Sequence, residues 1–405
     1  MRANFAIMKR LFLTLLAALS VSGPAAADVA VDNLQRIDFL SEGLPGGDLG
    51  NGLWSSSMPP TVVSLMAQIN GRALTPAGRR LYRRLLLTGA SSPNALGTDP
   101  DAGAARARGL IFVGEYEAAY ALFDRAPGLA SSAPLSQAVA EAALLNGATN
   151  RACQVAKSLA VSRGEIYWLR LRAFCQAEDG DLEAAQTTFS LAEESSHDAV
   201  FARMMGVLLA QTGSPGAPSS RNGLERALSI KLGLDVPKPA GPADDPARDP
   251  DGEALLAAMH AGRWDAIDDL MARAASATGP DRVRLQGRAL ICIALTDSVG
   301  ENRRVSELAF DAGPRSSLTG LAYEFDNAVT VKDRGGVVLM ALAITSANPT
   351  AADYITVIRG LHRVGLNDAA EDFAREAFLK LATPKAAPPA APRPATPPRP
   401  RPRGR

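Results

Sequence analysis

Apolar residues recur every three to four positions over most of residues 59–383, which is the spacing of an amphipathic helix. No segment there shows the convincing alternation of apolar and polar residues that is typical of a half-buried strand. Thr75 and Asp99 each precede a proline, so a capping side chain stands before a residue suited to the first helical turn. The pattern predicts an all-α fold.

A motif recurs at a fixed interval within this helical region. GEYEAAYALFDRA begins at Gly114, GATNRACQVAKSL at Gly147 and GDLEAAQTTFSLA at Gly180, so the copies start 33 residues apart. Related segments follow further along the chain, from Gly262, Gly300 and Gly365. A glycine suits the left-handed end of one helix, and a helix pair must stack on its neighbours to bury its apolar face. The repeat predicts an α-solenoid of antiparallel helix pairs.

Changes in composition divide the chain into segments. Residues 235–252 hold five prolines and five aspartates and cannot pack a core, so they predict a boundary between two helical domains. The predicted organisation is a signal peptide (1–27), an irregular N-terminal segment (28–58), an N-terminal helical-repeat domain (59–234), a Pro/Asp-rich linker (235–252), a C-terminal helical-repeat domain (253–383) and a disordered basic Pro-rich tail (384–405).

The first 27 residues have the pattern of a secretory signal peptide. Arg2, Lys9 and Arg10 precede an uncharged stretch over residues 11–21, and small residues follow up to a predicted cleavage site after Ala27. That stretch is shorter than the roughly 20 residues that cross a bilayer as a helix. No later uncharged run is long enough, so we expect no integral membrane segment after cleavage. The sequence therefore predicts a periplasmic or secreted bacterial protein.

The net charge of +1 conceals two opposite parts. Residues 28–383 carry −8, whereas residues 384–405 carry +6 and contain nine prolines. Such a tail is expected to be an extended polyproline II segment. It could bind a groove-type module, tether the protein to anionic surfaces, or act as a spacer without a specific partner. An exported protein with an acidic body is not expected to bind nucleic acid.

One repeat unit resembles a known family. Residues 168–192 carry the residues of a tetratricopeptide unit, namely Trp168, Leu171, Gly180, Ala184, Ala185 and Phe189. The other units lack the leading tryptophan, so the resemblance is to a degenerate tetratricopeptide-like array over about 107–378. The whole chain is also similar to uncharacterised secreted helical-repeat proteins of proteobacteria, which have a segment like LWSSSMPPTVVSLM (53–66) before RRLYRRLLL (79–87). The tetratricopeptide resemblance implies binding of peptides or proteins on a concave surface, by analogy of fold.

The cysteines support both the compartment and the helix pairing. Cys153 and Cys175 lie on consecutive predicted helices, at equal distances from Gly164 in the predicted turn. In an antiparallel pair such residues lie opposite one another, so they are candidates for a disulfide in an oxidising compartment. The alternative is a pair of buried thiols. Cys292, within LICIAL, is predicted to be a small buried core residue.

The chain carries little that is typical of catalytic chemistry. The three histidines are far apart in sequence, and the chain has no Gly-x-Ser-x-Gly elbow and no dinucleotide fingerprint after a strand. Glu194-Ser195 matches the catalytic pair of lytic transglycosylases, but the downstream Gly-x-x-Gln-type element of those enzymes is missing. We therefore predict no catalytic, cofactor-binding or metal-ligating residue.

A basic stripe is the remaining candidate surface. Arg79, Arg80, Arg83 and Arg84 recur at helical spacing and form one face beside Leu81 and Leu85. This face could receive an anionic partner, or it could be a solvated face whose arginine stems cover apolar surface. The sequence as a whole predicts a non-enzymatic scaffold or adaptor for cell-envelope proteins. The alternative is an envelope enzyme acting on peptidoglycan or another glycan, with a site that only folding assembles.

Overall fold

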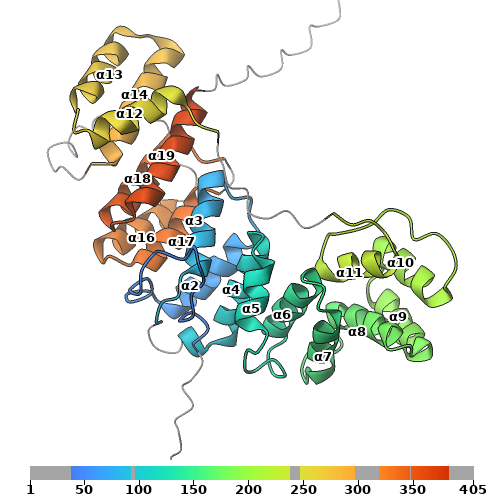
Figure 1. Ribbon diagram of the computed structural model, residues 1–405. Coiled ribbons are helices and arrows are strands. Elements are labelled where there is room, and N and C mark those ends of the chain that lie inside the picture. Colours follow the sequence, from blue (N-terminus) through green and yellow to red (C-terminus); the bar gives the residue numbers. More distant parts are fainter. Residues whose placement is uncertain (1–37, 93–95, 238–246, 297–318, 347, 383–405) are drawn as a thin grey trace, which may run out of the picture. The chain divides into compact units, whose positions relative to one another are not determined.

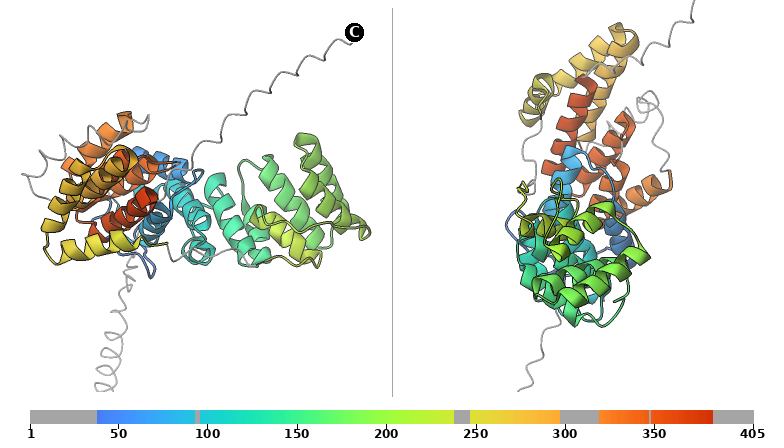
Figure 2. Two further views of the ribbon diagram at one scale, coloured as in Figure 1. Left: turned by 90° about the horizontal axis from the view of Figure 1, so that it is seen from above. Right: turned by 90° about the vertical axis from the view of Figure 1, so that its right-hand side faces the viewer.

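The computed structural model describes residues 38–92, 96–237, 247–296, 319–346 and 348–382. Within these ranges the chain forms helices and loops without a strand, which confirms the all-α prediction (Figure 1, Figure 2). The predicted signal peptide and the basic tail lie outside the described residues. None of the helices in the described ranges is long and apolar enough to span a membrane.

Seventeen α-helices are described. Those before the predicted linker are α2 (Pro59–Ile69), α3 (Pro76–Leu87), α4 (Pro100–Phe112), α5 (Tyr116–Phe123), α6 (Ala133–Leu145), α7 (Thr149–Ser158), α8 (Ile166–Glu178), α9 (Leu182–Ser195), α10 (Ala199–Ala210) and α11 (Gly223–Lys231), with a 3₁₀ turn at Leu96–Thr98. Those after it are α12 (Pro250–His260), α13 (Asp265–Ser276), α14 (Gly279–Ala294), α16 (Thr319–Thr330), α17 (Arg334–Ile344), α18 (Ala351–Arg363) and α19 (Asn367–Ala382).

Two predicted helix starts are confirmed. The Thr75 side chain accepts a hydrogen bond from the backbone N–H of Gly78 at 3.2 Å, and α3 begins at the next residue, Pro76. Asp99 accepts from Asp101 N at 2.9 Å, and α4 begins at Pro100. In both cases the cap satisfies an amide that has no partner within the helix.

The repeat glycines end helices, as their spacing predicts. Gly114, Gly147 and Gly180 have φ angles of 91°, 75° and 82° and follow α4, α6 and α8. A side chain is strained at such φ values, so glycine at these positions allows the chain to reverse into the next helix. The sequence therefore marks the helix pairs α4–α5, α6–α7 and α8–α9.

Helices that follow one another pack together in this region. The two helices of each pair contact one another, α6 also contacts α4, and α8 also contacts α7. Large side chains are buried between them, including Phe123, Trp168, Phe174 and Phe201, which are each at most 2% exposed. The apolar stripes seen in the sequence thus face neighbouring helices.

Helices α2 and α3 also pack against α17, and α3 contacts α19, although the chain separates them by more than 200 residues. Gly335 N donates to Leu53 O at 2.9 Å, and Ala77 N donates to the Glu376 carboxylate at 2.6 Å. A Cβ at Gly335 would lie 2.4 Å from the Trp54 ring, so the close approach requires glycine. The repeat pattern did not predict this contact, because the period relates only neighbouring segments.

The end of the predicted linker is helical. The Asp249 carboxylate accepts from Gly252 N at 2.9 Å, and α12 begins at Pro250. Asp249 also pairs with the buried Arg288 of α14 at 2.7 Å. The Asp-Pro pair, which the composition assigned to a linker, is here a helix start of the same kind as Asp99-Pro100.

Candidate binding site

A hollow of about 220 Å³ lies among α6, α8, α10 and α11. The polar and aromatic groups that line it include Glu141 of α6, Tyr167 and Arg170 of α8, Phe201 of α10, and Asn222 and Glu225 at the start of α11. Three of these helices, α6, α8 and α10, begin 33 residues apart, at Ala133, Ile166 and Ala199. They therefore occupy equivalent positions in successive repeats.

The local sequence explains why these groups meet. Tyr167 and Arg170 are three residues apart in α8, so both side chains lie on one face of that helix. Residues 138–145 of α6 have the sequence AVAEAALL, in which Glu141 is the only charged residue and the other seven are apolar. Packing the apolar part of α6 against its neighbours therefore brings the carboxyl group into contact with protein on most sides.

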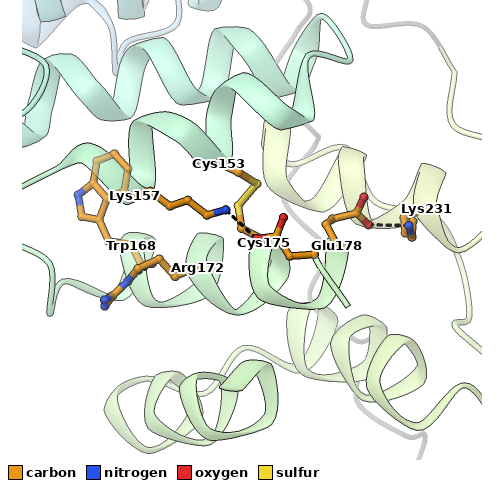
Figure 3. Close-up of a disulfide and its surroundings, with 8 residues drawn as sticks. Cys153, Lys157, Trp168, Arg172, Cys175, Glu178 and Lys231 are labelled. Carbon is orange, nitrogen blue, oxygen red and sulfur yellow. Dashed lines mark hydrogen bonds and ion pairs between the residues drawn. A yellow bond between two sulfur atoms is a disulfide. The ribbon is translucent and has the colours of Figure 1, made fainter. Parts of the chain in front are cut away.

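Helix α11 forms one wall of the hollow and is held at both ends. At its start, Gly223 N donates to Oε2 of Glu141 at 2.6 Å, and the Asn222 side chain caps the helix by accepting from Glu225 N at 2.8 Å. At its end, Lys231 pairs with Glu178 of α8 at 3.0 Å (Figure 3). A carboxylate near the first turn and a lysine in the last turn also have favourable interactions with the helix dipole.

Ion pairs fix the other charged groups on this wall. Arg221 donates to Asp198 at 2.7 Å and also to the Glu225 carboxylate. Arg170 lies 5.3 Å from the centre of the Phe201 ring, and its Nη2 donates to a backbone carbonyl. The charge of Glu225 is thus already matched within the chain.

Three buried polar atoms of the hollow have no hydrogen-bond partner in the described part of the chain: Oε1 of Glu141, the Tyr167 hydroxyl and Nε of Arg170. The Tyr167 hydroxyl lies near the Glu141 carboxyl without a hydrogen bond of good geometry. A buried polar atom without a partner costs about 1–3 kcal/mol. Two of these atoms, Oε1 of Glu141 and the Tyr167 hydroxyl oxygen, can accept a hydrogen bond from a ligand, whereas Nε of Arg170 can only donate.

The surroundings also disfavour charge on the two acidic groups. Burial raises the pKa of Glu141 above its ordinary value, and the Glu225 charge adds to this, although the hydrogen bond from Gly223 N and the nearby Tyr167 hydroxyl act in the opposite direction. Burial raises the pKa of Tyr167 well above its usual range, and the nearby Glu141 contributes. A cation at the hollow would favour the charged form of Glu141.

Two larger hollows are each lined by an arginine whose guanidinium is already bound within the chain. One of about 500 Å³ contains Arg106, whose guanidinium donates to Leu86 O at 2.8 Å and to Phe39 O at 2.7 Å. Another of about 450 Å³ contains Arg84, which pairs with Asp48 at 2.8 Å. The hollow beside Glu141 is therefore the stronger candidate for a binding site.

The predicted disulfide is confirmed. Cys153 of α7 and Cys175 of α8 are bonded, with their Cα atoms 5.5 Å apart (Figure 3). The bond joins the two helices on either side of the turn that contains Gly164. Because Tyr167 is on α8, the disulfide also restrains the helix that supplies part of the hollow.

The predicted basic face makes contacts within the chain. Arg79 lies 5.5 Å from the centre of the Phe112 ring, Arg80 pairs with Asp372 at 3.2 Å, Arg83 pairs with Glu115, and Arg84 pairs with Asp48. An anionic partner would have to compete with three carboxylates of this chain. Binding at this face stays a prediction.

The other singled-out residues lie apart from the hollow. Cys292 is buried in α14, and burial raises the pKa of its thiol to about 12, which disfavours the reactive thiolate. His197 contacts Glu193 at 2.5 Å and His260 contacts Glu371 at 2.7 Å. In the described ranges, no group of three His, Cys, Asp or Glu side chains could hold a metal ion.

Glu141 and Tyr167 were not predicted from the sequence. One signal was present, since an isolated acidic residue within an apolar helical stretch must find partners when the helix is buried. Tyr167 carried no such signal because a tyrosine beside Trp168 fits an ordinary core. The contact of α11 with α6, which completes the hollow, crosses the irregular segment 211–222 and was not visible in the repeat.

No protein-family model, no curated protein and no solved structure matches this chain.

Proposed function

We propose that this protein is a non-enzymatic scaffold or adaptor in the bacterial periplasm, which binds other envelope proteins through the surface of a tetratricopeptide-like solenoid. The observation that carries the proposal is the hollow formed by α6, α8 and α10. These helices hold equivalent places in successive repeats, and their shared surface presents polar atoms that lack partners. Binding of polypeptides by such a surface is an analogy of fold.

The pairwise contacts support the solenoid part of the proposal. Helices α4 to α9 pack as successive antiparallel pairs, and each pair contacts the next. Stacking of this kind buries the apolar face of each pair against its neighbours and leaves a long surface for partners. The packing of α3 against α19 adds a contact that a simple sequential array does not require.

Two observations support the proposed compartment. The first residues of the chain have the pattern of a signal peptide with cleavage after Ala27. The bond between Cys153 and Cys175 fits an oxidising compartment such as the periplasm. Both indicate that the partners are envelope proteins.

Photo-crosslinking in cells tests this proposal. A photoreactive amino acid at Ile166, which lines the hollow, is expected to capture a discrete envelope protein. The matched control is the same replacement at the exposed Glu183 of α9, which lies away from the hollow and is expected to give no such product. The proposal is wrong if Ile166 captures nothing, or if both positions capture the same set of proteins.

A further inference from the structure

The hollow beside Glu141 has an unfilled hydrogen-bonding position. Oε2 of Glu141 accepts from Gly223 N at 2.6 Å, but the buried Oε1 accepts from no group in the described residues. When the carboxyl group is ionised, its oxygens accept hydrogen bonds and cannot donate them, so the missing partner of Oε1 is a donor. A positively charged donor is favoured, because an opposite charge nearby stabilises the ionised form of the buried carboxyl group.

The other groups of the hollow restrict the charge and hydrogen-bonding character of the ligand further. The Tyr167 hydroxyl, also buried and unpaired, can accept a second hydrogen bond from the same donor. The charge of Glu225 is matched by Arg221, and the positive charge of Arg170 is drawn towards Phe201 and towards Asp198 at 3.9 Å. The Glu141 carboxylate is therefore the acidic group of the lining without an ion-pair partner in the described residues, so the electrostatics favour a cation there.

The size of the hollow suits a short aliphatic chain. At about 30 Å³ for each water-sized group, the Cγ, Cδ, Cε and Nζ atoms of a lysine need about 120 Å³, and the hollow provides about 220 Å³. The rings of Tyr167 and Phe201 offer apolar surface to the methylene groups. An ammonium group carries three donors, enough to reach both unpaired acceptors.

We propose that this hollow binds an aliphatic primary ammonium group, with Glu141 as its charge partner and Tyr167 as a second acceptor, and that the group is a lysine side chain of the partner protein. The identity of the partner as a protein rests on the proposed function. Binding of the ammonium group itself does not.

Isothermal titration calorimetry on the purified full chain tests the inference, with Nα-acetyl-lysine N-methylamide as the probe. The same compound acetylated on Nε keeps the shape and removes the charge, and is expected to bind at least tenfold more weakly. Cadaverine distinguishes a free diamine from a lysine side chain. Tighter binding of cadaverine than of the lysine probe would overturn the assignment to a protein partner.

Two variants locate the binding. Glu141→Gln keeps an oxygen for Gly223 N but removes the charge, and is expected to weaken lysine-probe binding at least tenfold. The matched control is Glu183→Gln on α9, which makes the same charge change on an exposed surface and is expected to leave the affinity unchanged. Tyr167→Phe keeps the ring and is expected to weaken binding severalfold. Circular dichroism and melting temperature check that each variant is folded.

The outcomes separate this inference from the proposed function. The ammonium site is refuted if the wild-type chain releases no heat with the lysine probe at millimolar concentration, or if Glu141→Gln binds it as well as the wild type. A chain that binds the probe but captures no protein through Ile166 retains the ammonium site and loses the adaptor role. Capture without probe binding gives the reverse result.

Discussion

Two glutamates in this protein each accept a hydrogen bond from a backbone N–H at the start of another helix. They differ in whether the second carboxylate oxygen also has a partner. Glu376 of α19 is buried, with Oε2 accepting from Ala77 N at 2.6 Å at the start of α3. Its other oxygen accepts from the hydroxyl of Tyr354 in α18. A glutamate and a tyrosine on packed helices thus close off the N-terminus of a third helix, and both carboxylate oxygens are satisfied.

Glu141 repeats this arrangement at the start of α11 but leaves it incomplete. Its Oε2 accepts from Gly223 N at the same distance of 2.6 Å, and Tyr167 of α8 lines the same hollow. Here, however, Oε1 and the tyrosine hydroxyl are unpaired beside a hollow. The complete arrangement satisfies its buried groups, whereas the incomplete one leaves two of them unpaired at the hollow that we propose as a binding site.

The region around Glu141 contains the disulfide, whereas α18 and α19 around Glu376 contain no cysteine of this bond. Its removal is the change from which we expect the largest effect. Replacing Cys153 and Cys175 together by alanine is expected to lower the free energy of unfolding by about 3 kcal/mol, because the 22-residue loop is no longer closed in the unfolded chain. Urea denaturation measures the loss. Hydrogen exchange is expected to quicken more in α8, which the bond also restrains in the folded chain, than in α18 and α19, which contain no cysteine of this bond. Equal acceleration in both regions would contradict a local role of the disulfide.

Removing each glutamate tests the comparison itself. Glu376→Ala leaves Ala77 N and the Tyr354 hydroxyl without partners, whereas Glu141→Ala frees only Gly223 N. We expect Glu376→Ala to cost about 2 kcal/mol more than Glu141→Ala, since each orphaned buried group costs about 1–3 kcal/mol. Urea midpoints of both variants give the difference. Equal losses would mean that the two sites are equally complete.

The two tyrosines provide a smaller version of the same test. Tyr354→Phe removes the donor to Glu376 and is expected to cost about 1 kcal/mol. Tyr167→Phe removes a buried hydroxyl that has no partner in the described residues, so it is expected to leave the stability unchanged or to raise it. Thermal unfolding of the two variants under identical conditions measures the contrast, and a larger loss for Tyr167→Phe would reverse our interpretation.

The pH dependence of stability is the smallest expected effect. Because the pKa of Glu141 is raised in the folded chain, the folded chain keeps a proton that the unfolded chain has lost above about pH 4.3. The stabilising contribution is complete below that pH and is lost as the pH rises through the raised pKa. The stability of the wild type relative to Glu141→Gln should therefore fall over this interval. A constant or rising difference would contradict the shift.

Much of the helix pairing could be predicted from the sequence, because it depends on neighbours in the chain. The interval between Gly147 and Gly180 located the turns, and the equal distances of Cys153 and Cys175 from Gly164 located the disulfide. These predictions needed only helical geometry and a period.

The open site could not be predicted in this way. Glu141 and Gly223 are 82 residues apart, and the hydrogen bond between them depends on how α11 returns to α6 after an irregular segment. The same holds for Ala77 and Glu376, which are 299 residues apart. Such contacts follow from packing between elements that no period relates.

The most direct test of the open site is the pKa of Glu141 measured by ¹³C NMR with labelled glutamate. The carboxyl signal is assigned as the one that disappears in Glu141→Gln. We predict a pKa above the ordinary glutamate value of about 4.3 in the free protein, and a clear decrease when the lysine probe saturates the hollow, because a bound cation favours the carboxylate. An ordinary pKa in the free protein, or a raised pKa that the probe does not change, would contradict the ammonium site.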